Sequence, residues 1–418
     1  MMTLFNKKAN QNDRISDLPS NVIDGILGNL RIRDQVRTSI LSKKWRYMWT
    51  SASQLCFDEH FFESFILLDD DPEPVVSKII TDVLMIRNGP IHKFSICVSA
   101  DCEFDISTEK LNMWIPFMSR NLTHLKLLNY CTPPDENHMP DILFSCKELT
   151  YFKFSSFNLS IPPNFRGFEK LLELHLECVE FDSSALENFM SGCPVLEKLN
   201  IGFRLGSNRL VISSPSLKVL VLELHNTKLV CLRKAKNLSD FTLKAFHGRG
   251  YIRSSPKIKR FSLTNWGKNS YEDIIHPMLL SRSFSSLEYL KLDDLNLNDK
   301  GDILYLVRVL ESAPSLIDLV IKQSYKDIDT TKELYRSKEL ECPRILLQLQ
   351  TVDVHFRANS QYTTSLIRFI LANSPLLKTL TFYCSYNDLG APMMLNFSKD
   401  LLWMERASPK AQVNFRHV

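Results

Sequence analysis

Residues 214–222 read SPSLKVLVL, and the three leucines Leu217, Leu220 and Leu222 form the pattern L-x-x-L-x-L. Side chains of a β-strand alternate between two faces, so Leu220 and Leu222 point to the same side of a strand. Leu217 then anchors the turn that leads into the strand, and Pro215 ends any helix before it. One such unit cannot bury its apolar side alone, whereas stacked units can. The segment therefore predicts one unit of a repeat array.

The same pattern recurs in both directions along the chain, twelve times in all, at steps of 20 to 33 residues. Leucine-rich repeats have periods of about 20 to 29 residues, so two steps contain longer insertions. A single L-x-x-L-x-L arises by chance, but twelve at near-regular spacing favour a repeat array over a conventional α/β domain with coincidental leucines. The three apolar positions are Ile91/Phe94/Ile96, Leu122/Leu125/Leu127, Leu149/Phe152/Phe154, Leu171/Leu174/Leu176, Leu196/Leu199/Ile201, Leu217/Leu220/Leu222, Leu238/Phe241/Leu243, Ile258/Phe261/Leu263, Leu287/Leu290/Leu292, Leu316/Leu319/Ile321, Leu349/Val352/Val354 and Leu377/Leu380/Phe382.

The length of each unit predicts how the chain returns to the next strand. Longer units contain amphipathic segments that predict helices at 183–192, 301–312 and 363–374. The units of 20 to 21 residues between 217 and 258 are too short for a full helix, so we expect them to return by loops.

Stacked parallel strands predict a curved sheet whose concave face carries the side chains between the buried positions. These side chains are mixed in charge, which suits contact with a protein rather than with a phosphate backbone. From this face we select as candidate substrate-binding residues His124, Lys126, Lys153, His175, Lys198, Arg260, Tyr289 and Lys291.

Residues 13–54 differ from the repeats because they predict three short helices. Apolar residues at Val22, Ile23, Ile26, Leu27 and Leu30 have helical spacing and form one stripe. About 40 residues bury too little surface to be stable alone, so this module needs a neighbour. Either it caps the end of the repeat array, or it is a docking module whose core a partner completes.

Three stretches of this module, LP at 18–19, V-I-x-x-I-L at 22–27 and RTSILSKKWRYMWT at 37–50, resemble the F-box of plant F-box proteins. The resemblance implies that the module binds the small Skp adaptor and, through it, a cullin scaffold. Some matching residues must instead pack inside the module, and the sequence does not divide the two sets. Carried over by position, the adaptor-facing residues are Leu18, Pro19, Ile23, Ile26, Leu27, Val36, Ser39, Leu41, Ser42, Trp45 and Trp49.

The C-terminal region resembles the FBD domain of plant F-box/leucine-rich-repeat proteins, on the stretches LLQLQTVDVHF, TSLIRFILANSPLLKTLTF and ERASPKAQVNF. We expect the last helix and strand to cap the open end of the array. The expected elements are strands at 349–356, 378–383 and 411–416 and helices at 363–373 and 396–407.

The expected fold is therefore α/β: a small helical F-box, a curved leucine-rich-repeat solenoid with parallel strands on its concave face, and a C-terminal FBD cap. The expected division is a mobile leader at 1–12, the F-box at 13–54, the repeat array at 55–339, and the FBD domain with its cap at 340–418.

Other sequence features argue against several function classes. The net charge is only +4, which gives no reason to expect nucleic acid as a partner. The ten cysteines form no CxxC pair, so we expect no metal site and free thiols in a reducing compartment, the cytoplasm or nucleus. No signal peptide, membrane span, phosphate-binding loop or catalytic motif is present, so we expect no membrane partner, cofactor or catalytic residue.

The sequence thus predicts a non-catalytic subunit of a ubiquitin ligase, which binds the Skp adaptor through the F-box and an unknown protein substrate through the repeat face. Two alternatives stay open at this point. One is a small-molecule sensor in which a hormone or inositol phosphate completes the concave face, and the other is an interaction scaffold that does not cause degradation.

Overall fold

The computed structural model describes most of the chain in two compact units. One unit comprises residues 1–171 with 175–180, and the other comprises residues 172–174 with 181–418. The expected leader at 1–12 and the expected boundary at 339/340 lie outside the described residues. The described residues are 15, 17–65, 72–102, 104–130, 138–158, 160–162, 165–179, 183–203, 209–224, 229–232, 234–245, 251–253, 258–264, 284–297, 300–323, 346–355, 361–384 and 391–417.

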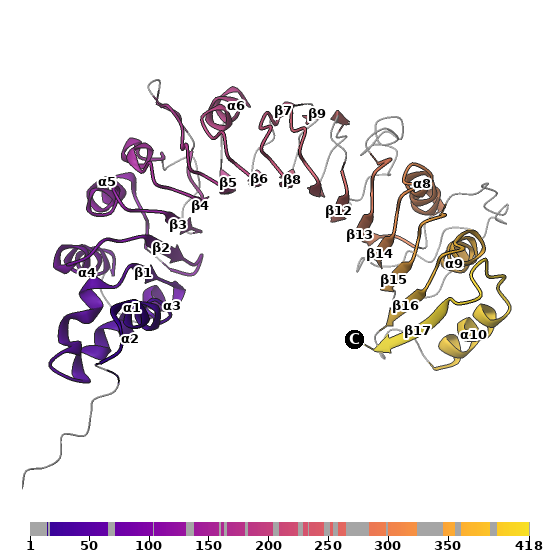
Figure 1. The fold of residues 1–418 in the computed structure, drawn as a ribbon, viewed down its shortest axis with the longest axis horizontal. Helices are drawn as coiled ribbons and strands as arrows, with labels where there is room; N and C mark the ends of the chain where they lie inside the picture. The colour runs from indigo at the N-terminus through magenta and orange to yellow at the C-terminus, as the bar shows by residue number, and fades with distance from the viewer. Residues whose placement is uncertain are drawn as a thin grey trace, which may run out of the picture. The chain divides into compact units, whose positions relative to one another are not determined.

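All twelve predicted repeats form a strand, and each strand begins one residue before the second apolar position (Figure 1). Every one of the apolar positions is at most 4% exposed, which confirms the predicted register. The strands are β2 (Lys93–Val98), β3 (His124–Asn129), β4 (Tyr151–Ser155), β5 (Glu173–Val179), β6 (Lys198–Phe203), β8 (Val219–Leu224), β10 (Asp240–Ala245), β12 (Arg260–Thr264), β13 (Tyr289–Leu295), β14 (Asp318–Gln323), β15 (Thr351–His355) and β16 (Thr379–Cys384).

Neighbouring strands pair in parallel at equivalent repeat positions. The strand order is β1-β2-β3-β4-β5 in the first unit and β6-β8-β10-β12-β13-β14-β15-β16-β17 in the second. Leu220 thus pairs with Phe241, and the next ring in this buried row is Phe261, 5.5 Å from Phe241. The turns also repeat, because the Lys218 and Val219 amides both donate to the Glu197 carbonyl. The array is therefore held by side-chain stacking and by a backbone turn shared between successive units.

Strands β1 (Gln54–Phe57) and β17 (Gln412–His417) are the first and last in the strand order and add one strand at each end of the twelve repeats. The first was not predicted, whereas the second matches the expected strand at 411–416 to within one residue. A separate three-stranded parallel sheet consists of β7 (Arg209–Val211), β9 (Leu229–Cys231) and β11 (Tyr251–Arg253). The described parts of the units between 217 and 258 contain no helix, as expected, but these units do not return by loops alone, because β9 pairs with β11 and with β7, and Leu210 and Val230 are buried.

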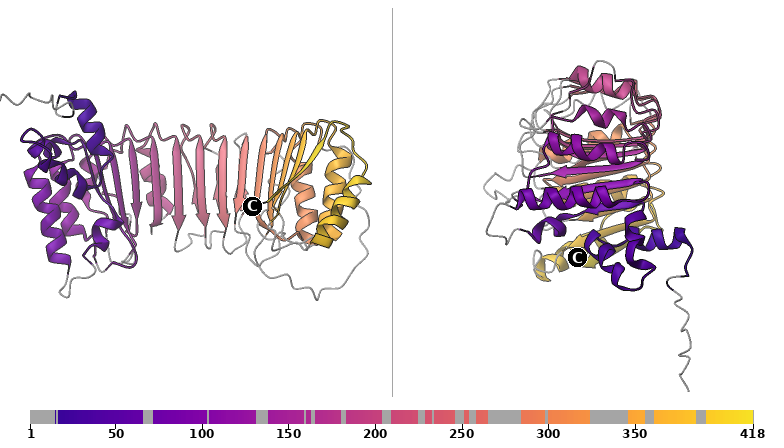
Figure 2. Two further views of the ribbon diagram at one scale, coloured as in Figure 1. Left: turned by 90° about the horizontal axis from the view of Figure 1, so that it is seen from below. Right: turned by 90° about the vertical axis from the view of Figure 1, so that its left-hand side faces the viewer.

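Helices cover only one face of the sheet in each unit, and we call the other face the open face (Figures 1 and 2). Trp114 of α5 is fully buried on the covered side, and its indole nitrogen donates to the Thr81 hydroxyl of α4 at 3.0 Å. The predicted helices at 183–192, 301–312 and 363–374 are confirmed. The helices are α3 (Glu59–Glu63), α4 (Glu73–Ile86), α5 (Thr108–Trp114), η3 (Ile115–Phe117), η5 (Asp141–Ser145), α6 (Ser183–Ser191), α8 (Lys300–Glu311), α9 (Gln361–Asn373) and α10 (Ala391–Leu402).

The last helix differs from its prediction. It was expected at 396–407, but α10 begins at Ala391, and Pro392 occupies the first turn, where proline is favoured. The chain leaves the helix after Leu402, and the Ala407 amide donates to the Leu371 carbonyl at the end of α9. That hydrogen bond ties the segment after α10 to the preceding helix, so the helix cannot continue to 407.

The N-terminal module consists of α1 (Ser20–Gly28), α2 (Ile32–Arg37) and the short 3-10 helices η1 (Thr38–Ile40) and η2 (Trp45–Ser51). Its core contains Ile23, Leu27, Trp45 and Ala52, and Leu18, Leu30, Met48 and Trp49 pack against that core. The buried amide of Gln35 donates to the Leu27 and Leu30 carbonyls at 2.9 and 3.1 Å. This side chain therefore fastens α2 to the end of α1.

Candidate adaptor-binding and substrate-binding surfaces

The predicted adaptor-facing residues divide into two sets. Ile23, Leu27 and Trp45 are 7%, 1% and 2% exposed, so these three form the core of the module rather than its surface. This corrects their placement on the adaptor-facing surface, because apolar side chains on one helical stripe pack inward when a core is available. Leu18, Ser39, Ser42 and Trp49 are half-buried, whereas Pro19, Ile26, Val36 and Leu41 are exposed.

Within residues 20–53 of the same module, three exposed apolar residues were not among the predicted adaptor-facing residues. Val22, Ile40 and Tyr47 are 41%, 85% and 68% exposed. Val22 and Ile26 are four residues apart on α1, which is the spacing that places two side chains on one helical face. We define the exposed F-box set as Val22, Ile26, Val36, Ile40, Leu41 and Tyr47.

A chain of hydrogen bonds fixes the module to the first repeat. The Asp24 carboxylate of α1 accepts from the Ser53 amide and from the Ser53 hydroxyl, both at 2.6 Å. The Ser53 carbonyl in turn accepts from the His92 and Lys93 amides at 2.8 and 3.1 Å, at the start of β2. Ser53 therefore connects α1 to the sheet of the first unit.

The segment 87–89 makes a second connection. The Arg87 guanidinium donates to the Trp49 carbonyl at 2.9 Å, and the Asn88 amide donates to the Thr50 carbonyl at 2.9 Å. Burial lowers the pKa of Arg87 to about 10, and the nearby Asp24 carboxylate opposes that shift. A Cβ atom on Gly89 would lie 3.0 Å from the Ser51 carbonyl oxygen, so the close approach of the two segments favours glycine.

Four of the candidate substrate-binding residues lie together on the open face of the first unit. The His124 and Tyr151 rings stack at 5.7 Å, and the His175 ring lies 5.4 Å from Tyr151. Lys126 and Lys153 are paired in register on neighbouring strands. Lys153 forms an ion pair with Glu177 at 2.8 Å, whereas Lys126 has no carboxylate partner among the described residues.

The other four candidates lie on the open face of the second unit, where ion pairs between neighbouring strands neutralise the charges. Lys198 contacts Glu173 at 3.3 Å, and Lys244 contacts Glu223 at 3.6 Å. Arg260 contacts Asp240 at 3.3 Å and lies 4.1 Å from the centre of the Tyr289 ring. Two strands, β8 and β10, separate Lys198 from Arg260, so the structure does not bring these candidates together as one site.

Further along the second unit, His355 and Tyr383 stack face to face at 4.3 Å, and Lys291 forms an ion pair with Asp293 at 2.7 Å. Burial, followed by the charge of Lys322, lowers the pKa of His355. The His355 side chain therefore favours its neutral form. Sequence reasoning did not select this pair, although the register of β15 and β16 places both residues on the open face.

Three buried cysteines favour the protonated form. Burial raises the pKa of Cys97 to about 11 and that of Cys146 to about 12, and it also raises the pKa of Cys384. A thiol must ionise to act as a nucleophile, so these three are not activated for that role. The described residues contain no group of three or more histidine, cysteine, aspartate or glutamate side chains arranged to hold a metal ion. None of the described helices has the length and apolar character needed to cross a membrane.

Comparison with known proteins agrees with this geometry. A model of the F-box domain matches residues 15–56, and a model described as "FBD-associated F-box protein At5g56370, LRR repeats" matches residues 112–260. The Arabidopsis thaliana F-box/FBD/LRR-repeat protein At1g13570 is 31% identical over 96% of this chain and 98% of its own length. The FBD-associated F-box protein At4g10400 from the same plant is 23% identical over 96% of this chain and 100% of its own length.

The F-box match covers the module with the exposed apolar set, and the repeat match covers strands whose register the structure confirms. The similarity to At1g13570 extends along nearly the whole of both chains. The chain therefore belongs to the family of F-box/FBD/leucine-rich-repeat proteins.

Proposed function

We propose that the protein is the substrate-recognition subunit of a Skp–cullin–F-box ubiquitin ligase. Proteins that combine an F-box with leucine-rich repeats generally act in this way, and they are typically non-catalytic. One observation carries the proposal for this chain: the exposed F-box set presents six large apolar side chains, between 37% and 85% exposed, on one small module. Large apolar side chains exposed on a small module are typical of a protein-interaction site, and we assign these six to binding of the Skp adaptor.

The adaptor assignment is tested with a pair of exposed residues. Ile40→Asp combined with Leu41→Asp places two charges where the adaptor would bury apolar surface, and we expect co-elution with a Skp adaptor to be lost. Both side chains are more than half exposed, so the fold should survive. The matched control is Met85→Asp combined with Ile86→Asp on α4, which changes two similarly exposed residues of the same unit.

The expected result is loss of the adaptor from the Ile40/Leu41 variant and full co-elution of the control. Equal binding by both variants would show that the exposed F-box set is not the adaptor site. Failure of the wild-type chain to bind, under conditions where another F-box protein binds, would overturn the proposed function itself.

We further propose that the open face of the first unit binds an acidic segment of the substrate. The cations Lys93 and Lys126 have no carboxylate partner among the described residues there, whereas Lys198, Lys244 and Arg260 of the second unit are already paired. The rings of His124, Tyr151 and His175 form an aromatic row on the same face, in which the His175 ring is tilted by 42° against Tyr151. Complementary charge mainly sets specificity and the rate of encounter, and aromatic contacts contribute affinity.

The open face of the first unit is tested in a full-length variant that is expected not to bind the adaptor and therefore not to join the ligase. The Ile40→Asp/Leu41→Asp variant serves as a substrate trap, because deletion of 1–54 would remove Ser53 and its hydrogen bonds to β2. Lys93→Glu with Lys126→Glu is added to one copy and Lys198→Glu with Lys244→Glu to another. We expect quantitative mass spectrometry of the purified complexes to show partners lost only from the first. Retention of the same partners by both would contradict the assignment of the first unit.

The two alternatives make different predictions. A small-molecule sensor should carry a bound molecule detectable by native mass spectrometry of protein from its source, and the ion pairs on the second open face leave few free cations there to hold an anion. A scaffold without degradation should leave the amounts of its partners unchanged when the protein is removed, whereas loss of a ligase subunit should raise them.

As part of the proposal we place the protein in the cytoplasm or nucleus, which a fluorescent fusion tests.

A further inference from the structure

The last strand of the second unit, β17, has one paired edge and one unpaired edge (Figure 1). It pairs in parallel with β16 and ends the strand order, so no described strand lies on its other side. The Gln412 amide donates to the Lys378 carbonyl at 2.9 Å, which shows that the backbone of Gln412 faces β16. The hydrogen-bonding groups of successive residues in a strand point to opposite edges, so those of Val413 and Phe415 face the unpaired edge.

The apolar side chains of β17 are also only partly covered. Val413 and Phe415 pair with Leu380 and Phe382 of β16, which are both fully buried. In the twelve repeats, residues at these positions are at most 4% exposed, whereas Val413 and Phe415 are half-buried. Phe415 stacks on Phe382 at 5.2 Å, and Phe397 of α10 lies 6.5 Å from it. The side of Phe415 that the next strand would cover in a repeat has no described strand beside it.

The first strand of the first unit, β1, is protected differently. Its apolar residues Leu55 and Phe57 are 1% and 0% exposed, and α1, α2 and α3 all contact the strand. Natural proteins protect edge strands with proline, charge or a bulge, because an unpaired edge binds other strands. Pro409 and Lys410 precede β17, but residues 413–415 include neither proline nor a charged side chain. The edge of β17 is therefore open to pairing.

A second, antiparallel copy of β17 complements this edge. A twofold axis through Asn414 places Val413 of each copy opposite Phe415 of the other. Opposed residues of an antiparallel pair exchange both backbone hydrogen bonds at alternate positions, so the outward amide of each residue finds the outward carbonyl of the other. Opposed side chains share one face, so Val413 covers the open side of Phe415. Gln412 then lies opposite Arg416, and no two like charges oppose each other.

We propose that two copies of the chain associate through β17 as an antiparallel strand pair related by a twofold axis. Such an interface uses the same surface on both copies, and residues 412–416 are complementary to themselves in the register centred on Asn414. One strand pair buries less than the roughly 1,200 Å² of a stable complex, so we expect a dissociation constant on the order of 10 µM. The inference does not depend on the proposed function, because no residue of β17 belongs to the proposed adaptor or substrate sites.

Sedimentation velocity of the full-length chain measures this association directly. We expect mostly monomer at about 1 µM and mostly dimer at about 200 µM, as a dissociation constant of roughly 10 µM requires. A monomer throughout this range would overturn the proposal.

Hydrogen exchange at single residues tests where the two copies meet. At about 1 µM the Val413 and Phe415 amides should exchange quickly, whereas the Gln412 and Asn414 amides, which face β16, should be protected. At about 200 µM the exchange of Val413 and Phe415 should slow by about fivefold, in line with the fraction of dimer. Protection of these two amides at both concentrations would show that one chain already covers its own edge, and it would overturn the proposal. Unchanged exchange in a dimer would place the interface elsewhere and do the same.

A proline substitution breaks the pairing without breaking the fold. Val413→Pro removes an outward amide and places proline on an edge, where strands tolerate it, because this amide does not face β16. The dissociation constant should rise at least about tenfold, while protection of the Gln412 amide stays as in the wild-type chain. Dimerisation of this variant with wild-type affinity would contradict the strand pair.

The charge opposite Arg416 tests the register. Gln412→Glu places a carboxylate there and should tighten the dimer about twofold to tenfold, since the pair occurs twice in a twofold assembly, and Gln412→Arg should weaken it by a similar factor. Gln412 is exposed, so both variants should fold. Asn188→Glu and Asn188→Arg make the same changes of charge at an exposed position of α6 and should leave the dissociation constant within about twofold. Equal responses at the two positions, or a change in the same direction for both Gln412 variants, would overturn the proposed register.

Discussion

The N-terminal module and the repeats use their apolar residues in opposite ways. In the twelve repeats, all three apolar positions are at most 4% exposed, because each unit stacks on the next. In the module, Ile23, Leu27 and Trp45 are buried, but the six members of the exposed F-box set remain between 37% and 85% exposed. The repeats thus complete their core within the chain, whereas the module keeps apolar surface that a partner can bury. The exposed apolar surface of the module is the difference on which the proposed adaptor site rests.

The largest expected effect separates the two sets inside the module. Trp45→Ala removes a side chain that is 2% exposed, and it should lower the free energy of unfolding by about 3–5 kcal/mol. Leu41→Ala removes a side chain that is 59% exposed, and it should change that free energy by less than about 0.5 kcal/mol while weakening adaptor binding. Hydrogen exchange of residues 20–53 in increasing urea measures the free energy of unfolding of the module. Co-elution with a Skp adaptor measures adaptor binding.

The repeats provide the control for this prediction. Leu220→Ala in β8 should cost about 2–5 kcal/mol and leave adaptor binding unchanged, because Leu220 belongs to the buried row of the second unit. The division of the module into buried and exposed apolar residues would be contradicted if Leu41→Ala destabilised it as much as Trp45→Ala. In that event Leu41 would be a core residue, and it would no longer belong to the exposed F-box set.

The repeat sheet could be predicted from sequence because its signal is local. The spacing of Leu217, Leu220 and Leu222 by itself fixes one turn and one strand register, and the structure repeats that result twelve times. The short strands β7, β9 and β11 were missed because three residues are too few for alternation to be visible. Their only sequence signal is that Leu210, Val230 and Ile252 recur at a repeat-like interval and pair in register.

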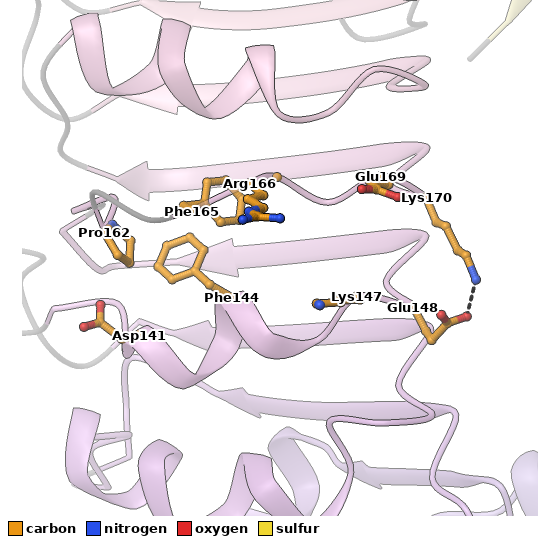
Figure 3. A pocket seen from close by; sticks show the side chains of 10 residues that line it. Asp141, Phe144, Lys147, Glu148, Pro162, Phe165, Arg166, Glu169 and Lys170 are labelled. Carbon is orange, nitrogen blue, oxygen red and sulfur yellow. Dashed lines mark hydrogen bonds and ion pairs between the residues drawn. The ribbon is translucent and has the colours of Figure 1, made fainter.

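The surfaces were harder to predict because they depend on residues far apart in sequence. The helical stripe of α1 identified Ile23, Ile26 and Leu27 as apolar, but packing against Trp45 decides which of them is buried. On the open face, Lys198 is neutralised by Glu173, which is 25 residues earlier and comes from the preceding repeat. The pocket beside Phe144 has no motif at all, since it forms only where residues 141–148 meet Pro162 and residues 165–170 (Figure 3).

A smaller loss of stability is expected from a substitution at the junction between the N-terminal module and the first repeat. Asp24→Ala removes the two carboxylate oxygens that accept hydrogen bonds from the Ser53 amide and hydroxyl. The Ser53 carbonyl in turn accepts from the His92 and Lys93 amides at the start of β2. Hydrogen bonds to a charged group contribute about 1.5–3 kcal/mol, so the first unit should lose roughly 2 kcal/mol of stability.

The matched control for the junction is Asp34→Ala, which removes the exposed ion pair of Asp34 with Arg37 and should cost less than about 0.5 kcal/mol. Adaptor binding should survive in both variants, because neither residue belongs to the exposed F-box set. Hydrogen exchange at Ser53, His92 and Lys93 should accelerate in Asp24→Ala alone. Unchanged exchange at these three amides would mean that the module and the first repeat are held together by apolar packing, and that the Asp24–Ser53 hydrogen bonds do not set their orientation.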